Sequence, residues 1–164
     1  MLSRPARQAG ITLLESLVAM LVLSVGIGAL AWAQARHLAD GRDTAARSMA
    51  VLLTEDLADR MLFNRSAAAN GGYRLAWGER PAPADCRSGP CPGSALARAD
   101  LSAWRDALAQ ALPDSDAHVF AAGGSGRQMG IAISWRWTGA SALAPSTGFD
   151  CPAQSNCHVT YVPF

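Results

Sequence analysis

Apolar and polar residues follow three different patterns along the chain, and each pattern predicts a different element. From Ile11 to Ala33 the side chains are apolar almost without interruption, apart from Glu15 and a few small polar residues. About 20 apolar residues are enough for a helix to cross a bilayer. We therefore expect the first stretch to be a membrane-spanning helix.

Beyond the apolar run, apolar residues recur at intervals of three and four residues. This spacing places apolar side chains at Ala45, Met49, Leu52, Leu53, Leu57 and Met61, with most charged residues on the other side. This is typical of an amphipathic helix with one apolar stripe. No proline interrupts residues 11–65, which predicts one helix of roughly 80 Å. Gly26 and Gly28 are weak points for a bend or local melting, and "NGG" at residues 70–72 is expected to end the pattern.

The remaining chain predicts a loop, a short helix and antiparallel strands. Residues 78–95 are rich in proline and glycine and read as a loop. In the next helix we expect Asp100 as N-cap and Pro113 as the stop, with one apolar face formed by Leu101, Trp104, Leu108 and Leu112. Alternating residues predict a hairpin of strands 118–122 and 128–137 around "GGSG", and a last strand at 157–164. This order indicates the α+β class.

The four cysteines form two close pairs, Cys86 with Cys91 and Cys151 with Cys157 along the sequence. Neither pair has the CxxC spacing of a zinc site, and the only histidine nearby is His158. An even number of cysteines in loops of an exported protein favours disulfides over metal binding or free thiols. The spacing leaves all three pairings open, although a bridge within each close pair would fix its loop.

Charge and motif content argue against a catalytic or nucleic-acid-binding protein. The net charge is +1 and no lysine is present, so no strong positive field is available for nucleic acid. A short basic strip formed by Arg127 and Arg136 is the one feature that keeps a nucleic-acid-binding function open. The three histidines are scattered, and no metal-binding, nucleophile or phosphate-loop motif occurs. We therefore expect no enzyme activity, metal or cofactor.

The residues before the apolar run are short, polar and positive, with Arg4 and Arg7. By the positive-inside rule they place the N-terminus in the cytoplasm and the rest of the chain across the membrane, in an oxidising compartment. A secretory signal peptide has a shorter apolar core of about 7–15 residues, although "GALAWAQA" resembles its cleavage site.

Neither a signal peptide nor a plain membrane anchor explains Glu15. A charge in the apolar core costs about 2.5–3.5 kcal/mol on insertion scales, so its presence indicates a function with a partner. A cut between Gly10 and Ile11 would create an α-amino cation about one helical turn before Glu15. That amine is a candidate partner, within the same chain or from a neighbouring subunit.

The segment "GITLLES" resembles the class III signal of type IV pilins and pseudopilins, in which a basic leader ends in Gly before an apolar residue, Thr, two apolar residues and Glu. The resemblance implies that a prepilin peptidase cuts between Gly10 and Ile11 and methylates Ile11. It also implies that Thr12 and Glu15 serve assembly, with Glu15 used in methylation and subunit docking. Ile11 departs from the family, in which Phe is commoner here.

The later helix, the strand ending "ISWRW" and the late cysteine pair look more narrowly like PilV-type minor pilins. This likeness implies a pilin fold, in which a long N-terminal helix packs on a small antiparallel sheet. The expected parts are a leader at 1–10, a transmembrane and assembly half of the helix at 11–35, an amphipathic half at 36–66, and a periplasmic head at 67–164.

The same likeness implies a minor pilin that is held in the inner membrane and then incorporated in the pilus, with roles in biogenesis, adhesion or motility. The implied partners are other major and minor pilins, the prepilin peptidase and the inner-membrane assembly platform. Two alternatives stay open. One is a type II secretion pseudopilin, which shares the N-terminal signature. The other is a pilus-borne binding module for DNA or surfaces.

Overall fold

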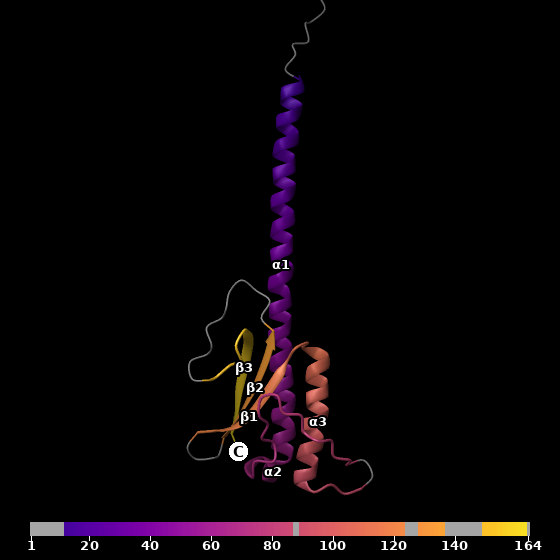
Figure 1. Cartoon of the computed structure of the whole chain (residues 1–164), viewed down its shortest axis with the longest axis vertical. Coiled ribbons are helices and arrows are strands. Elements are labelled where there is room, and N and C mark those ends of the chain that lie inside the picture. The colour runs from indigo at the N-terminus through magenta and orange to yellow at the C-terminus, as the bar shows by residue number, and fades with distance from the viewer. Residues whose placement is uncertain (1–11, 87–88, 124–127, 137–148, 164) are drawn as a thin grey trace, which may run out of the picture. The chain divides into compact units, whose positions relative to one another are not determined.

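The structure, a computed structural model, describes residues 12–86, 89–123, 128–136 and 149–163. In these residues the helices all precede the strands along the chain (Figure 1). The helices are α1 (Thr12–Phe63), α2 (Arg65–Ala69) and α3 (Gly93–Ala111), and the strands are β1 (Asp116–Ala122), β2 (Gln128–Arg136) and β3 (Ser155–Pro163). This combination of a long N-terminal helix and a small antiparallel sheet confirms the α+β, pilin-like layout.

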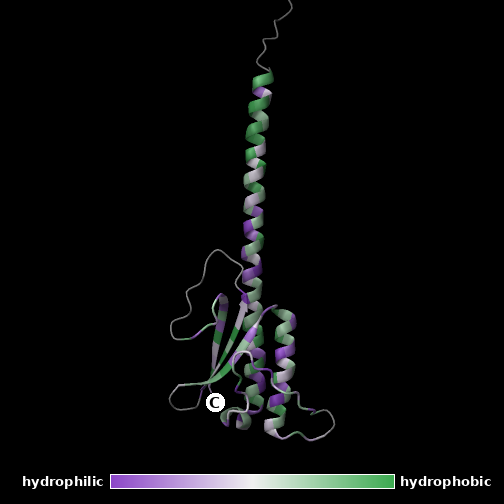
Figure 2. Cartoon of the chain, viewed as in Figure 1, coloured by the Kyte–Doolittle hydropathy of each residue, from purple (hydrophilic) through white to green (hydrophobic). Residues whose placement is uncertain are grey.

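The chain divides into two compact units, of which the first ends at Gly41 and the second begins at Arg42. Helix α1 contributes to both units. In the first unit it is strongly apolar, as its colouring in Figure 2 shows, and its large side chains are exposed. The helix is continuous through Gly26 and Gly28, so the expected weak points do not interrupt it. A Cβ at either glycine would meet none of the described residues outside the neighbouring helix backbone within 4 Å.

The second unit has a core built from the end of α1, from α3 and from one face of the sheet. The sequence predicted the helix stripe correctly at Leu57 and Met61, which are fully buried. It was wrong at Ala45, Met49 and Leu52, which are exposed. The packed stripe instead begins with small residues, Ala46, Ala50 and Thr54. Small side chains allow neighbouring elements to approach a helix closely, and they carry little weight in a hydrophobic pattern.

The long helix ends where Asn64 leaves the helical conformation, at φ −118° and ψ 48°. Its side-chain amide donates to the Gly93 carbonyl at 2.7 Å, so the break is tied to the start of α3. Helix α2 then ends as "NGG" predicted. Gly71 adopts a φ of 77°, and the Gly72 amide donates to the Ala67 carbonyl at 2.8 Å, which satisfies a carbonyl at the helix end.

Helix α3 begins at Gly93, seven residues before the N-cap expected from the sequence. The prediction of Asp100 as N-cap was therefore wrong. Three of the seven residues from Gly93 to Ala99 are alanine and none is proline, which favours helix, and the Asp100 carboxylate serves a long-range contact instead. The predicted apolar face is confirmed, because Leu101, Trp104, Leu108 and Leu112 are all buried.

Two hydrogen bonds fix α3 against its neighbours. The Trp104 indole donates from Nε1 to the Leu53 carbonyl of α1 at 2.8 Å. The nearly buried Arg105 pairs with Asp116 at the start of β1 at 2.8 Å. In Figure 1, α3 and the sheet flank the end of α1.

The sheet has the order β1-β2-β3, and both pairings are antiparallel. The predicted hairpin is confirmed in β1 and β2, whereas Trp137 and most of the "GGSG" turn lie outside the described residues. Alternate residues of β2 face the core, as the sequence predicted, namely Met129, Ile131, Ile133 and Trp135.

The other face of the sheet is covered too, which the alternating pattern did not predict. Aromatic rings gather there, and the Phe120 ring lies so close to Gly130 that a Cβ would stand 2.3 Å from its Cζ. Phe120 also stacks on Phe149, with ring centroids 5.3 Å apart, and meets Tyr161 edge-on. Ala132, the cross-strand partner of His118, is consequently fully buried.

Candidate functional site

The candidate assembly site is the beginning of α1. The predicted cleavage and methylation positions, Gly10 and Ile11, lie outside the described residues. Helix α1 begins at Thr12 and carries Glu15 in its first turn. A carboxylate there is favoured by the positive end of the helix dipole, by about 0.3–1 kcal/mol at an exposed site.

Glu15 differs from the other polar residues of the apolar run in how its side chain is satisfied. The Ser16 hydroxyl donates to the Leu13 carbonyl at 3.0 Å, and the Ser24 hydroxyl donates to the Leu21 carbonyl at 2.8 Å. Both hydroxyls are therefore satisfied within the helix and can enter an apolar medium at little cost. The exposed Glu15 carboxylate forms no ion pair with any residue that the structure describes.

This arrangement leaves one charged group in need of a partner from outside the described helix. A carboxylate that enters a bilayer unpaired costs several kcal/mol, whereas an ion pair with an amine reduces that cost. The site thus offers a carboxylate in the first helical turn that is able to pair with a cation. Thr12, also predicted for assembly, is the first residue of the helix.

The second unit contains two disulfides, which join Cys86 to Cys91 and Cys151 to Cys157. Of the three pairings that the sequence left open, the structure has the one within each close pair. The Cα–Cα distances are 5.3 Å and 6.1 Å. Each bridge closes one short loop, and no free cysteine is present among the described residues.

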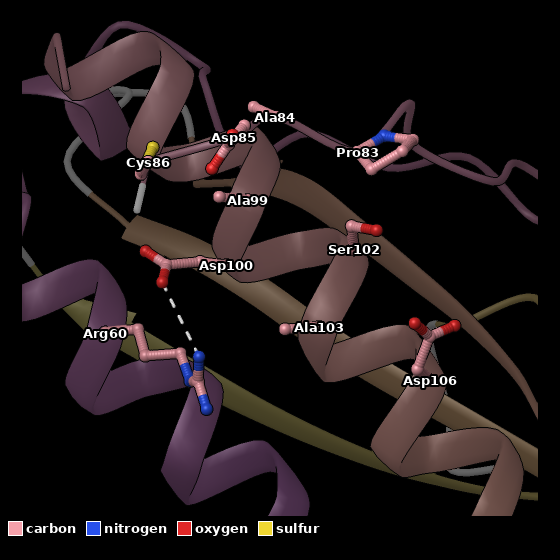
Figure 3. A pocket seen from close by; sticks show the side chains of 10 residues that line it. All are labelled: Arg60, Pro83, Ala84, Asp85, Cys86, Ala99, Asp100, Ser102, Ala103 and Asp106. Carbon is pink, nitrogen blue, oxygen red and sulfur yellow. Dashed lines mark hydrogen bonds and ion pairs between the residues drawn. The ribbon is translucent and has the colours of Figure 1, made fainter. Parts of the chain in front are cut away.

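A surface groove of about 870 Å³ lies beside Arg60 and α3 and is lined by Asp85, Asp100, Ser102 and Asp106 among others (Figure 3). Two of its polar residues, Arg60 and Asp100, form an ion pair at 3.5 Å. Asp100 also accepts a hydrogen bond from the Tyr73 hydroxyl at 2.6 Å.

Burial, reinforced by the hydrogen bond to Asp100, raises the pKa of Tyr73 far above its ordinary value of 10.0. The hydroxyl therefore stays protonated and keeps donating to the carboxylate. These contacts join α3 to the end of α1 and indicate a structural role. In the described parts of the chain, no group of three or more His, Cys, Asp or Glu residues is placed to hold a metal ion.

The alternative basic strip has little support from the residues described. Arg127 lies outside them, and Arg136 forms an ion pair with Asp114 at 2.9 Å. A guanidinium paired in this way offers less positive potential to a phosphate backbone.

Two histidines of the second unit lie in packed surroundings. His118 belongs to the aromatic face, with its ring centroid 5.4 Å from that of Trp77, and burial lowers its pKa. His158 faces α1 and lies 3.0 Å from the Thr160 hydroxyl through Nε2, and the Thr160 hydroxyl meets that of Thr54 at 3.4 Å. Burial, with a smaller effect of Arg47, lowers the pKa of His158. Both histidines are packing residues.

Comparison with known proteins finds one relationship, and it falls on the candidate assembly site. Residues 5–31 match the family described as the prokaryotic N-terminal methylation motif. No curated protein and no solved structure matches the chain.

The matched segment contains the predicted cleavage position and Glu15. It continues into the one described helix that is long and apolar enough to cross a membrane. The motif implies processing by a prepilin peptidase and assembly into a pilus or pseudopilus, and it points to a structural protein. Residues 5–31 thus carry a type IV pilin-like prepilin signal, which supports the pilin and pseudopilin superfamily for this chain.

Proposed function

We propose that this protein is a minor, low-abundance type IV pilin. A prepilin peptidase cuts between Gly10 and Ile11 and methylates the new N-terminal residue. The chain then waits in the inner membrane with its second unit in the periplasm, and it enters the pilus as part of a priming or tip complex. The observation that carries the proposal is the match over residues 5–31 around Glu15, the one charge in the apolar run.

The proposed assembly step is an ion pair between Glu15 and the α-amine of a neighbouring subunit. The two groups of one chain are separated by about one helical turn, so a staggered neighbour brings its amine to the same level. An uncompensated Glu15 opposes burial, and pairing removes that penalty only in the correct register. Thr12, at the first helical position, belongs to the same contact.

The proposed partners are other major and minor pilins, the prepilin peptidase and the inner-membrane assembly platform. A type II secretion pseudopilin is the alternative within the same superfamily, because it shares the N-terminal signal. Pilus genes beside the coding gene would favour the first assignment, and secretion genes would favour the second.

Intact mass of the mature protein tests the processing step. We expect loss of residues 1–10 and a gain of one methyl group on Ile11. A mature chain that begins after Ala33 or Ala35, as a secretory signal peptide would leave it, overturns the proposal.

Substitution of Glu15 tests the assembly step. Glu15→Ala should be processed and inserted but be lost from sheared filaments, because it cannot pair with the neighbour's amine. Ser16→Ala is the matched control, since its hydroxyl is satisfied within its own helix and its loss should not affect incorporation. Glu15→Ala chains at normal abundance in filaments would contradict the proposed pairing.

A further inference from the structure

The apolar run of the first unit has a defined length between charges. From Ser16 to Ala35 no residue is charged, a run of 20 residues bounded by Glu15 and Arg36. At 1.5 Å per residue this run is about 30 Å long, which is the thickness of the hydrocarbon core of a bilayer. The charge boundary at Arg36 therefore falls where the helix would leave the hydrocarbon.

At this boundary the structure brings together an aromatic ring and a cation. Trp32 and Arg36 are one helical turn apart, and the Arg36 guanidinium carbon lies 5.3 Å from the centroid of the Trp32 ring. Trp32 is 65% exposed, so its side chain is not buried by the residues that the structure describes. The pair thus forms one amphipathic surface, in which a guanidinium lies over an apolar ring.

Such a surface matches the headgroup region of a bilayer. Tryptophan is enriched at membrane interfaces because its ring is apolar while its N–H needs a polar partner. A guanidinium binds phosphate oxygens through paired N–H donors, and a cation over the indole face gains about 0.5–1 kcal/mol at an exposed site. Charged residues then become frequent after Arg36, which suits an aqueous surface.

We propose that Trp32 and Arg36 form an interfacial anchor that binds lipid phosphate groups on the side of the membrane opposite the leader. This inference rests on the membrane anchoring proposed above. The anchor fixes the depth of the helix. With Trp32 in the headgroup region, Glu15 lies about 26 Å away along the axis, just inside the hydrocarbon near the other surface. Arg36 and Trp32 thereby hold Glu15 at the level where a neighbour's amine can meet it.

Depth-dependent fluorescence quenching tests the anchor on the full-length protein. The protein is reconstituted in vesicles of phosphatidylethanolamine and phosphatidylglycerol that carry bromines either near the headgroup or near the bilayer centre. Headgroup-level bromines should quench the wild-type protein, and this quenching should be lost in Trp32→Phe, which isolates Trp32 from the other tryptophans. Equal quenching of both proteins, or stronger quenching of Trp32 by the central bromines, would overturn the anchor.

Replacement of the cation tests the pair. In Arg36→Gln, Trp32 quenching should shift toward the central bromines because the phosphate contact is gone. The matched control is Arg42→Gln, which removes the same charge about 9 Å farther along the helix and should leave the profile unchanged. An Arg36→Gln profile identical to wild type would overturn the role of Arg36.

Two further outcomes separate this inference from its alternatives. If Trp32 is a contact between subunits, headgroup-level quenching will rise as the protein is diluted with lipid, and that result overturns the anchor. Carbonate extraction checks insertion independently. A chain that carbonate strips from the vesicles overturns the proposed membrane anchoring, whereas an inserted chain without shallow Trp32 quenching overturns the anchor alone.

Discussion

Removal of the Tyr73 hydroxyl is expected to destabilise the second unit by about 2 kcal/mol. The Tyr73 side chain is fully buried, and its hydroxyl donates to Asp100 at 2.6 Å. A hydrogen bond to a charged group contributes about 1.5–3 kcal/mol, and Tyr73→Phe leaves the partly buried carboxylate with only the longer Arg60 contact of 3.5 Å among those described. The hydrophobic burial of the ring is retained, so the change isolates the polar contact.

Urea unfolding of the detergent-solubilised protein measures this effect. It is followed by tryptophan fluorescence under conditions that leave both disulfides intact. The matched control is Tyr161→Phe, since Tyr161 is 49% exposed, and its free energy of unfolding should change by less than about 0.5 kcal/mol. A double-mutant cycle with Asp100→Asn should give a coupling of at least about 1 kcal/mol. A Tyr73→Phe protein as stable as the control would refute the reasoning that this network joins α3 to α1.

Two further predictions concern the faces of the sheet. Burial lowers the pKa of both His118 and His158 from 6.5, so below pH 6.5 the unfolded chain binds more protons than the folded one. The free energy of unfolding should fall as the pH drops below 6.5 and stay level above it, and a His118→Asn/His158→Asn protein should show a flatter profile in urea titrations. Gly130→Ala should cost about 1–3 kcal/mol because its Cβ meets the Phe120 ring. If the clash is real, Phe120→Ala should partly restore the stability of the Gly130→Ala protein. Losses of stability from the two substitutions that simply add would argue against the clash.

The sequence predicted the elements well where one physical signal dominated. The hairpin alternation and the face around Trp104 both rest on large side chains that must be buried, and the structure buries them. The apolar run was predicted from its length and composition, and the structure has it as the first part of α1. Glu15 was identified for the opposite reason, because a carboxylate is costly in such a run. Its partner cannot be read from one chain if that partner belongs to a neighbour.

The errors have a common physical origin in contacts that are distant in sequence. Asp100 has the residue type of an N-cap, but a tyrosine 27 residues away uses its carboxylate. The helix stripe was centred on large residues, while the packed face includes Ala46 and Ala50, whose small side chains carry little weight in a hydrophobic pattern. The aromatic face depends on Phe149 meeting Phe120 across the chain, which no local pattern encodes.

The two disulfides also determine how the second unit can acquire its covalent links. Their cysteines are only 5 and 6 residues apart, so the nearest thiol along the chain is the correct partner for each. Closing such a short loop costs only about 2 kcal/mol of chain entropy per bridge. A mispaired bridge across the chain would close a much longer loop and would cost about 2 kcal/mol more. Oxidation can therefore proceed without a search among the three pairings, and before the sheet is complete. The folding of the second unit should therefore depend little on an isomerase to correct its bonds.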